Sequence, residues 1–295
     1  MSLQPLSITP QLRQQLAEWL QEDLGRGDLS APALQGVEGE AQWVAKAPGV
    51  FCGGVLIEPL LRELANGERN WSIDVRVADG ASVEAGDALL QLRGPAVMLV
   101  ALERTALNLA MRLSGIATAT AALVAQLEGT GVALADTRKT TPGLRTLEKY
   151  AVRCGGGVNH RMGLDDAAML KENHLAWAGG VTAAIAAVRA DAPWPARVIV
   201  EAESAEEAHA AVVAGADAVL LDEFSPDALK TLVPSLRAQA ALRPARTSVV
   251  LEASGVNPAE LPLYAATGVD LISSSAPMTR SSWLDLSMRF TPAGS

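Results

Sequence analysis

The chain has 295 residues, 49% of them hydrophobic, which is enough for one large domain or two modest ones and excludes a disordered chain. Its 24 Lys and Arg against 33 Asp and Glu give a net charge of −9, which argues against a nucleic-acid partner. We see no signal-peptide pattern and no apolar segment of membrane-span length, so we expect a cytoplasmic protein without a membrane partner.

The first part of the chain mixes helical and strand patterns. Residues 11–24 have an apolar helical face introduced by Thr9 and Pro10, and residues 55–65 predict a second helix. The expected strands are residues 41–46, 73–77 and 89–92. These elements predict an N-terminal α/β sandwich-like domain over residues 1–115.

A polar stripe marks the helix expected over residues 102–113. Three polar residues recur at every fourth position of this apolar segment: Arg104, Asn108 and Arg112. Such a stripe faces solvent, a ligand or a partner. Ser114 and Gly115 predict a break, followed by another helix over residues 117–127.

From residue 132 onward, short β-rich runs alternate with helical patterns about six times. The expected strands are residues 132–135, 167–170, 198–200, 218–221, 249–251 and 270–273. The expected helices are near residues 144–154, 180–190, 205–214, 226–240 and 258–266. This alternation predicts an incomplete, about six-stranded parallel α/β barrel over residues 116–275. The tail at residues 276–295 is a candidate to pack back on the N-terminal domain.

One basic stretch stands out from the acidic background. Residues 136–171 hold seven Lys or Arg against four acids, a net charge of +3. Because these residues follow or precede expected strands, several of the cations would converge at the end of the barrel where parallel α/β folds bind ligands. Arginine holds carboxylates or phosphates bidentately, and lysine adds a point charge. Each cation alone could equally be an ordinary solvated residue, but the set indicates a site for a small, highly charged anion.

Acidic and small polar residues follow the later strands. Glu201 and Asp222 would lie at the same barrel end as the cations, where carboxylates suit Mg²⁺ arriving with substrate phosphates. For each acid alone, an ordinary ion pair is an equal alternative. Ser254 and Gly255 follow another strand and could give backbone N–H groups to a phosphate.

Ordered motifs along nearly the whole chain carry a resemblance to a known family. The central motifs are DTRKTTPGLR from residue 136, KYAVRCGGGVNHRMGL from residue 149 and KENH from residue 171. Further motifs are EDLGRGD from residue 22, DGASVEAGD from residue 79, LERTALNLAMRLSGIAT from residue 102, LLDEF from residue 220, EASG from residue 252, TGVD from residue 267 and LDLSMRF from residue 284. In these motifs the chain resembles the quinolinate phosphoribosyltransferase family.

The resemblance implies transfer of the phosphoribosyl group of phosphoribosyl pyrophosphate to quinolinate with decarboxylation, giving nicotinate mononucleotide, pyrophosphate and CO₂. It also implies a Mg²⁺ cofactor held by Glu201 and Asp222, largely through substrate or water, and a homodimer with shared active sites. The implied catalytic residues are Lys139, Lys171, Glu201 and Asp222. The implied quinolinate ligands are Arg138, His160, Arg161 and Lys171, with Arg104 of the partner subunit. The implied contacts to the phosphoribosyl group and pyrophosphate are Lys139, Lys171, Ser254, Gly255 and Ser275.

The chain has three histidines, His160, His174 and His209. His160 is either a general acid/base or a hydrogen-bond donor to a carboxylate, and we favour the second because neither chemical step removes a proton from the substrate. His174 is expected to be structural, and His209 to lie on a surface helix. Cys52 and Cys154 lack metal-ligand spacing and are expected to be buried free thiols.

Two positions depart from the family pattern. Glu223 stands where the family usually has Asn, and Ser275 stands where a glycine is expected to approach the sugar phosphate. Lower affinity, a changed loop and a new contact from the serine hydroxyl all stay open. Three alternatives to this function stay open. The protein could transfer the phosphoribosyl group to another planar acid such as nicotinate, it could be the related protein encoded with molybdate transporters, or it could be a non-catalytic relative. The number of cations favours a dicarboxylate over an acid with one carboxylate.

Overall fold

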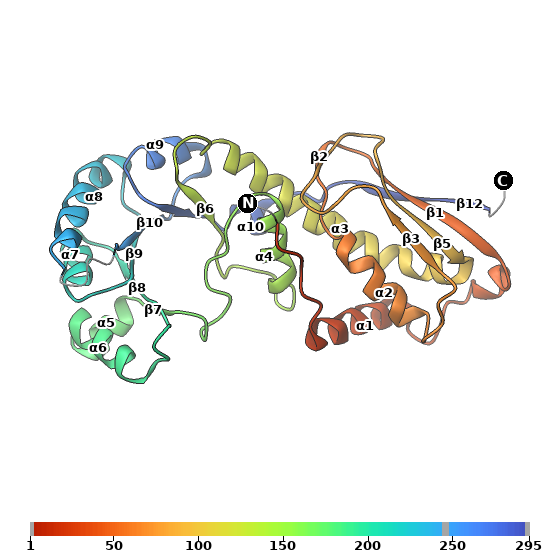
Figure 1. Ribbon diagram of the computed structural model, residues 1–295, viewed down its shortest axis with the longest axis horizontal. Coiled ribbons are helices and arrows are strands. Elements are labelled where there is room, and N and C mark those ends of the chain that lie inside the picture. Colours follow the sequence, from red (N-terminus) through yellow and green to blue (C-terminus); the bar gives the residue numbers. More distant parts are fainter. Residues whose placement is uncertain (1–2, 244–247, 293–295) are drawn as a thin grey trace. The chain divides into compact units, whose positions relative to one another are not determined.

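A computed structural model describes residues 3–243 and 248–292 of the chain. The chain divides into two compact units, coloured along the sequence in Figure 1. Unit 1 comprises Met1–Ala121, Leu147–Gly156 and Arg280–Ser295, and unit 2 comprises Ala122–Thr146 and Gly157–Thr279. Mixed α/β architecture is therefore confirmed, with an antiparallel sheet in the first unit and a parallel sheet in the second.

Unit 1 is built on a four-stranded antiparallel sheet in the order β12-β1-β5-β3. Its strands are β1 (Glu38–Ala45), β3 (Ser72–Val75), β5 (Ala88–Pro95) and β12 (Leu286–Pro292), and a small second sheet pairs β2 (Gly49–Val50) with β4 (Ser82–Val83). Its first two helices are α1 (Pro10–Leu24) and α2 (Ile57–Leu64). Thr9 begins α1 by accepting a hydrogen bond from the Leu12 amide at 3.2 Å. The sequence reading did not include β12, which pairs with β1 along its whole length.

A single helix, α3 (Ala96–Ala125), replaces the two helices expected on either side of Ser114 and Gly115. The break was wrong because both residues serve packing instead. Ser114 Oγ accepts from the Cys52 amide at 2.9 Å and donates to the Cys52 carbonyl at 3.0 Å. A Cβ atom at Gly115 would lie 2.1 Å from the Ser282 carbonyl oxygen, so only glycine permits this close approach of two backbones.

Among the described residues, α3 is also long and apolar enough to cross a membrane, contrary to the expectation from the sequence. Its most apolar 18-residue window has a mean hydropathy of 1.3, and 44% of that window is buried inside the protein. Leu99, Leu102 and Leu113 are buried. These features are those of a helix in a protein core.

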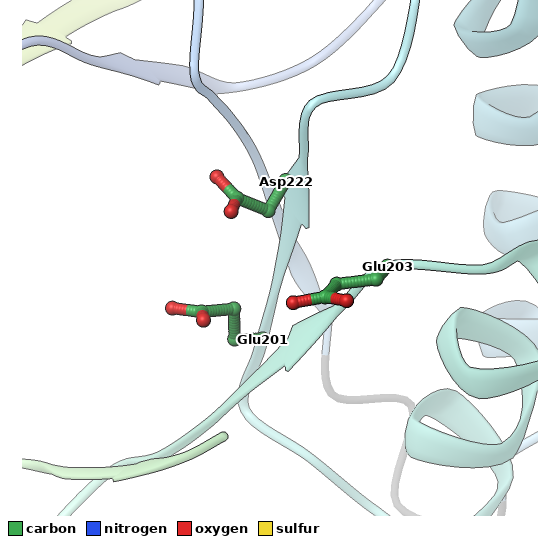
Figure 2. Close-up of side chains that lie close together, drawn as sticks. All are labelled: Glu201, Glu203 and Asp222. Atoms are coloured by element: carbon green, nitrogen blue, oxygen red, sulfur yellow. The ribbon is translucent and has the colours of Figure 1, made fainter. Parts of the chain in front are cut away.

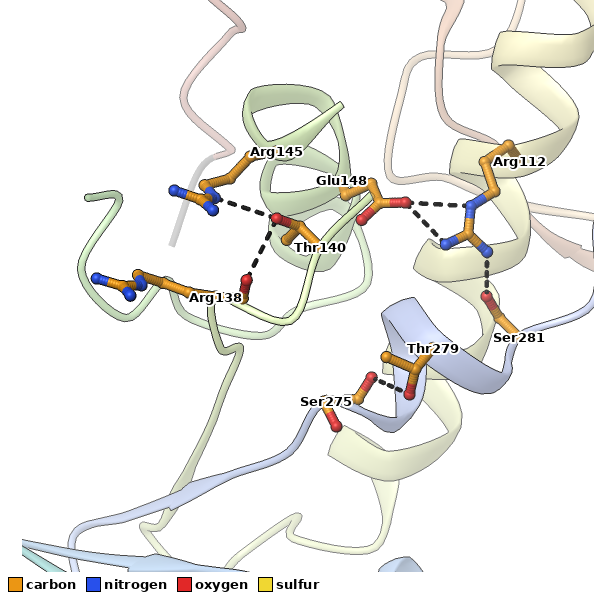
Figure 3. A network of polar contacts seen from close by, with 8 residues as sticks. All are labelled: Arg112, Arg138, Thr140, Arg145, Glu148, Ser275, Thr279 and Ser281. Carbon is orange, nitrogen blue, oxygen red and sulfur yellow. Dashed lines mark hydrogen bonds and ion pairs between the residues drawn. The ribbon is translucent and has the colours of Figure 1, made fainter. Parts of the chain in front are cut away.

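Helix α4 (Arg145–Cys154) follows the first barrel strand in sequence, but its residues from Leu147 onward belong to unit 1. Arg112 of α3 donates to the fully buried Glu148 at 2.8 Å, and the same guanidinium donates to Ser281 at 3.2 Å (Figure 3). Tyr150 donates to Asp79 at 3.0 Å. Arg112 is thus part of the packing of unit 1, whereas Arg104 is exposed, so the two arginines of the expected polar stripe have different surroundings.

The described residues of unit 2 form six parallel strands in the order β6-β11-β10-β9-β8-β7, which confirms the incomplete α/β barrel. The strands are β6 (Ala133–Ala135), β7 (Ala168–Leu170), β8 (Val198–Ala202), β9 (Ala218–Asp222), β10 (Val250–Ser254) and β11 (Leu271–Ser273). The helices are α5 (Glu172–Ala178), α6 (Val181–Asp191), α7 (Ala205–Val213), α8 (Pro226–Ala241), α9 (Leu261–Ala265) and α10 (Ala276–Arg280). Figure 1 shows α6, α7 and α8 along the outer side of the strands.

Alternation along each strand separates two faces of the barrel wall. Val200, Leu221 and Ala253 belong to the large core cluster that the strands share with the helices. The residues one step away, such as Ile199 and Leu220, form a second, small cluster on the opposite face. That inner face continues, two residues further along each strand, into polar side chains: Lys171, Glu201, Asp222, Glu252 and Ser254.

Candidate active site

The inner face of unit 2 borders a pocket of about 360 Å³. Its charged and titratable lining residues are Asp136, Arg138, Lys139, His160, Arg161, Lys171, Glu201, Asp222 and Glu252, joined by Ser254 and Ser273. A larger pocket of about 670 Å³ lies in unit 1 beside Trp71 and Asp79, but no cation is among its described lining residues. The chemistry therefore points to the pocket of unit 2.

The loop after β6 presents Arg138 and Lys139. The Lys139 amide donates to Thr137 Oγ1 at 3.1 Å, and the Thr140 amide donates to the Arg138 carbonyl at 2.9 Å, so hydrogen bonds within the turn fix its shape. Arg145 braces this turn by donating to Thr140 Oγ1 at 3.1 Å (Figure 3). Both Arg138 and Lys139 are exposed, which leaves their side chains accessible to a ligand.

The loop that carries His160 and Arg161 is anchored on Asp136, which is 1% exposed. One Asp136 oxygen accepts from the His160 amide at 2.8 Å, and the other accepts from Asn159 Nδ2 at 2.6 Å. Backbone bonds between this loop and β6 join Val158 to Leu134 and Asp136. Asp136 thus acts as a structural anchor that holds the loop beside the first strand.

Arg138 and Arg161 come from different loops but line the same pocket. Burial, followed by the positive charge of Arg138, lowers the pKa of Arg161 from its ordinary value. Arg161 also donates to the Ala167 carbonyl at 2.9 Å, which fixes its direction. Two cations that repel each other at one site favour an anion between them.

Lys171 directly follows β7 and begins α5, a helix that was not expected from the sequence. Its ammonium donates to Glu201 Oε2 at 2.5 Å. Its amide donates to His174 Nδ1 at 3.1 Å, so His174 caps α5 as a structural residue. Of the two other histidines, His160 lines the pocket. His209 lies on α7, where its Nδ1 is 2.8 Å from Gln239 Oε1.

Three carboxylates gather at the ends of β8 and β9. Glu201, Glu203 and Asp222 each present an oxygen, and these oxygens all lie within 4.8 Å of one another (Figure 2). Partial desolvation and the neighbouring carboxylates, Glu172 first among them, raise the pKa of Glu203. A hard divalent cation would relieve this repulsion, and an all-oxygen donor set suits Mg²⁺.

The remaining expected site residues lie outside the pocket lining. Gly255 follows the lining residue Ser254 directly, with φ +73°. Arg104 is an exposed residue of unit 1. Ser275 precedes α10, where its carbonyl accepts from the Thr279 hydroxyl (Figure 3). The backbone amides near Ser275 that could reach a phosphate are those of Ser274, Ser275 and Ala276. The Ser274 amide donates to Ala135, and the Ala276 amide donates to Ser274 Oγ.

Three acidic residues at or beside the pocket were not among the expected site residues: Asp136 and Glu252 line it, and Glu203 lies beside Glu201 and Asp222. The sequence does carry a signal for Glu252, because an acid between Leu251 and Ala253 in a buried strand must face away from the helices. Glu203 lies two residues after Glu201 and shares its side by the same periodicity. Asp136 has no comparable signal, since it anchors a loop that folds back from residues 157–161.

Two family models match the chain, one over its N-terminal part and one over its C-terminal part. The model for the quinolinate phosphoribosyl transferase N-terminal domain matches residues 28–114, and that for the C-terminal domain matches residues 116–289.

Individual relatives agree with these matches. The chain is 43% identical over 277 residues to a probable nicotinate-nucleotide pyrophosphorylase [carboxylating] of Synechocystis sp., covering 93% of this chain and 90% of the relative. It is 37% identical over 274 residues to the human nicotinate-nucleotide pyrophosphorylase [carboxylating], covering 92% and 89%. The crystal structure of NadC from Streptococcus pyogenes superposes with a TM-score of 0.88 at 34% identity, covering 98% of this chain and 99% of that one. The chain therefore belongs to the quinolinate phosphoribosyl transferase family.

Proposed function

We propose that this protein transfers the phosphoribosyl group of phosphoribosyl pyrophosphate to quinolinate and releases pyrophosphate, CO₂ and nicotinate mononucleotide, a step of NAD biosynthesis. One observation carries the proposal: four cations and three clustered carboxylates meet at the ligand end of an incomplete barrel in a member of this family. Cations match the acid and the phosphates, and the carboxylates match a metal that travels with pyrophosphate.

Arg138 and Arg161 are the proposed ligands of the two quinolinate carboxylates, with Lys171 nearby. Their mutual repulsion is relieved when a dianion lies between them, and guanidinium groups can bind each carboxylate bidentately. Nicotinate has one carboxylate and would leave one cation without its partner. The site therefore favours quinolinate over nicotinate.

Lys139, Lys171, Ser254 and Gly255 are the proposed contacts of the phosphoribosyl and pyrophosphate groups. Glu201 and Asp222 would hold Mg²⁺, with Glu203 as an additional donor, and Mg²⁺ when bound would neutralise charge on the pyrophosphate. The Lys171–Glu201 ion pair at 2.5 Å keeps the lysine beside the three carboxylates, where its ammonium can stabilise the negative charge of the departing pyrophosphate.

The chemistry consists of two steps. The pyridine nitrogen attacks the anomeric carbon as the bond to pyrophosphate breaks, and the lysines stabilise the negative charge that develops on the leaving group. The ring nitrogen is then positively charged, so it stabilises the electron pair that stays on carbon 2 when the 2-carboxylate departs as CO₂. Carbon 2 uses this pair to bind a proton. Arg138 and Arg161 would hold the ring in the orientation for attack.

The 5-phosphate is proposed to bind near Ser275. With the Ser274 and Ala276 amides engaged and Pro277 without an N–H, the Ser275 amide is the remaining donor of that set. Ser275→Gly should leave the KM for phosphoribosyl pyrophosphate equal or lower if the hydroxyl is unused and raise it if the hydroxyl binds phosphate. An unaltered KM and kcat in Ser275→Trp would move the phosphate site elsewhere.

The active unit is proposed to be a cytoplasmic homodimer in which Arg104 of the partner subunit completes the quinolinate site. An exposed arginine in an apolar helix supports this role, because a cation there has no evident use within its own unit. Nucleic acid and membrane are not proposed as partners.

Product analysis tests the proposal. The protein is incubated with phosphoribosyl pyrophosphate, Mg²⁺ and either quinolinate or nicotinate, and nicotinate mononucleotide, pyrophosphate and CO₂ are measured. We expect all three products from quinolinate and little turnover of nicotinate. Turnover of nicotinate alone would indicate the single-carboxylate rival, and no turnover of either acid would favour a non-catalytic relative.

A further inference from the structure

Glu252 is a pocket residue for which the proposed reaction has so far no use. It lies in β10 and is 3% exposed. In the strand register, Glu252 and Glu201 both pair with Leu220 of β9, so the two acids stand at the same level on either side of that residue. Asp222 and Ser254 pair with each other one inward-facing step further along the strands. Glu252 is therefore at a deeper level of the pocket than these two residues.

His160 fixes one end of this carboxylate. The Arg161 amide donates to His160 Nδ1 at 2.7 Å, so that nitrogen is an acceptor and the proton of the neutral ring is on Nε2. Nε2 lies 3.2 Å from Glu252 Oε2, with the two side chains 10% and 3% exposed. The histidine thus donates to Glu252 through Nε2 and accepts from the Arg161 amide through Nδ1. With this assignment, neither ring nitrogen binds a substrate carboxylate.

The second oxygen of Glu252 is unused. Oε1 is buried and has no hydrogen-bond partner among the described residues. An unsatisfied buried acceptor costs roughly 1–3 kcal/mol, which a donor from a ligand would recover. Glu252 lines the pocket, and the broad terminal torsion of glutamate permits a rotation that presents Oε1 to a ligand.

The two substrates differ in what they can give to this oxygen. Ionised quinolinate has only acceptors, namely its carboxylate oxygens and the ring nitrogen. Phosphoribosyl pyrophosphate also has acceptors on its phosphates, but its ribose carries hydroxyl groups on carbons 2 and 3. We propose that Glu252 accepts a hydrogen bond from a ribose hydroxyl of phosphoribosyl pyrophosphate, and that His160 positions the Glu252 carboxylate for this contact. This inference rests on the proposed function.

Substrates lacking one hydroxyl test this assignment. Values of kcat/KM are measured with phosphoribosyl pyrophosphate and with its 2-deoxy and 3-deoxy analogues, for the native protein, Glu252→Gln and the control Glu128→Gln, which changes an exposed glutamate. A hydrogen bond to a charged group predicts that one deoxy analogue loses about 10- to 100-fold in the native protein and the control. In Glu252→Gln that loss should shrink to less than about 3-fold, because the partner charge is gone.

Two further readouts separate this role from a general effect on the fold. The affinity of Glu252→Gln for quinolinate alone should stay within about 2-fold of the native value, since quinolinate has no donor for Glu252. His160→Ala should reduce discrimination against the same deoxy analogue, and His160→Gln should restore part of it because an amide N–H can replace Nε2. A purely structural histidine would lower activity without changing that discrimination.

Distinct results would overturn the inference. Equal losses from both analogues in the native protein and in Glu252→Gln, or weaker quinolinate binding as the main effect, would remove the ribose role. If Glu252→Gln does not fold, the native protein still decides, because equal kcat/KM for all three sugars contradicts the proposal. No turnover of phosphoribosyl pyrophosphate with quinolinate would instead reject the proposed function, and the inference with it.

Discussion

Glu223 and Gly255 contact each other directly after the pocket residues Asp222 and Ser254. A Cβ atom at Gly255 would lie 3.0 Å from Glu223 Cγ and 3.2 Å from the Glu223 amide nitrogen. Both residues are in the left-handed region, with φ of +57° for Glu223 and +73° for Gly255. The Glu223 amide donates to the Ser254 carbonyl at 3.2 Å, so this pair of unusual conformations joins the ends of β9 and β10.

This relationship predicts opposite effects of two substitutions on stability. Glu223→Asn should raise the free energy of unfolding by about 0.5–1 kcal/mol, because Asn adopts the left-handed conformation at lower cost. Gly255→Ala should lower it by about 1–3 kcal/mol through strain and the close contact with Glu223. Urea unfolding measures both. A destabilised Asn variant or a neutral Ala variant would mean that these conformations do not carry the expected cost.

Arg161 should be required for quinolinate binding. Arg161→Ala removes a partner of a buried carboxylate, which predicts an affinity loss of roughly 2–5 kcal/mol. Arg138→Ala should behave similarly, whereas Arg69→Ala, at an exposed site in unit 1, should bind normally. Calorimetric titration with quinolinate gives the affinities. Unchanged affinity in both pocket variants would rule out their proposed role.

Mixed dimers should reveal shared sites. Arg104→Ala and Lys139→Ala subunits are each expected to be inactive alone, because one lacks the residue given to the partner and the other lacks a pocket lysine. After subunit exchange, some mixed dimers would contain one intact site, so activity should return in part. Exchange verified by mass spectrometry without recovery of activity would argue that each site belongs to one chain.

Asp79 should make the stability of the protein depend on pH. Burial is the main cause of the raised pKa of Asp79, against hydrogen bonds from Gly53, Gly54 and Tyr150 that lower it. A raised folded pKa gives stability that is fully present below the ordinary value of 3.8 and is lost as pH rises through the folded pKa. The native protein should therefore lose stability relative to Asp79→Asn over this window. A difference between their urea midpoints that is constant with pH would contradict this.

The periodicity of the sequence was sufficient to predict the barrel but not every connection. Its strands are buried on both faces except at their ends, so they appear as short β-rich runs between helices. Gly115 was misread because a glycine needed for close packing against Ser282 has the same sequence signal as a helix break. The strand β12 was missed because its pairing with β1 joins residues far apart in sequence.

Pocket residues could be predicted from the sequence where local strand patterns place them, but not where contacts between distant residues do. Arg138, Lys171, Glu201 and Asp222 were found because they follow strands, and parallel strands bring their ends together. Glu252 could not be identified from the sequence as the partner of His160, since the pair depends on contacts with the Arg161 amide and across the barrel. Such contacts arise only when the loop after α4 folds back against β6.

Isotopic stoichiometry tests the central claim most directly. Quinolinate labelled in its 2-carboxylate is incubated with the native protein, phosphoribosyl pyrophosphate and Mg²⁺. The amounts of labelled CO₂ and of pyrophosphate released are then measured separately in the same reaction. Transfer followed by decarboxylation in the unit 2 pocket predicts one labelled CO₂ per pyrophosphate, and loss of both in Lys139→Ala. Pyrophosphate release with the label retained in the organic product, or no release of either, would contradict the proposed reaction.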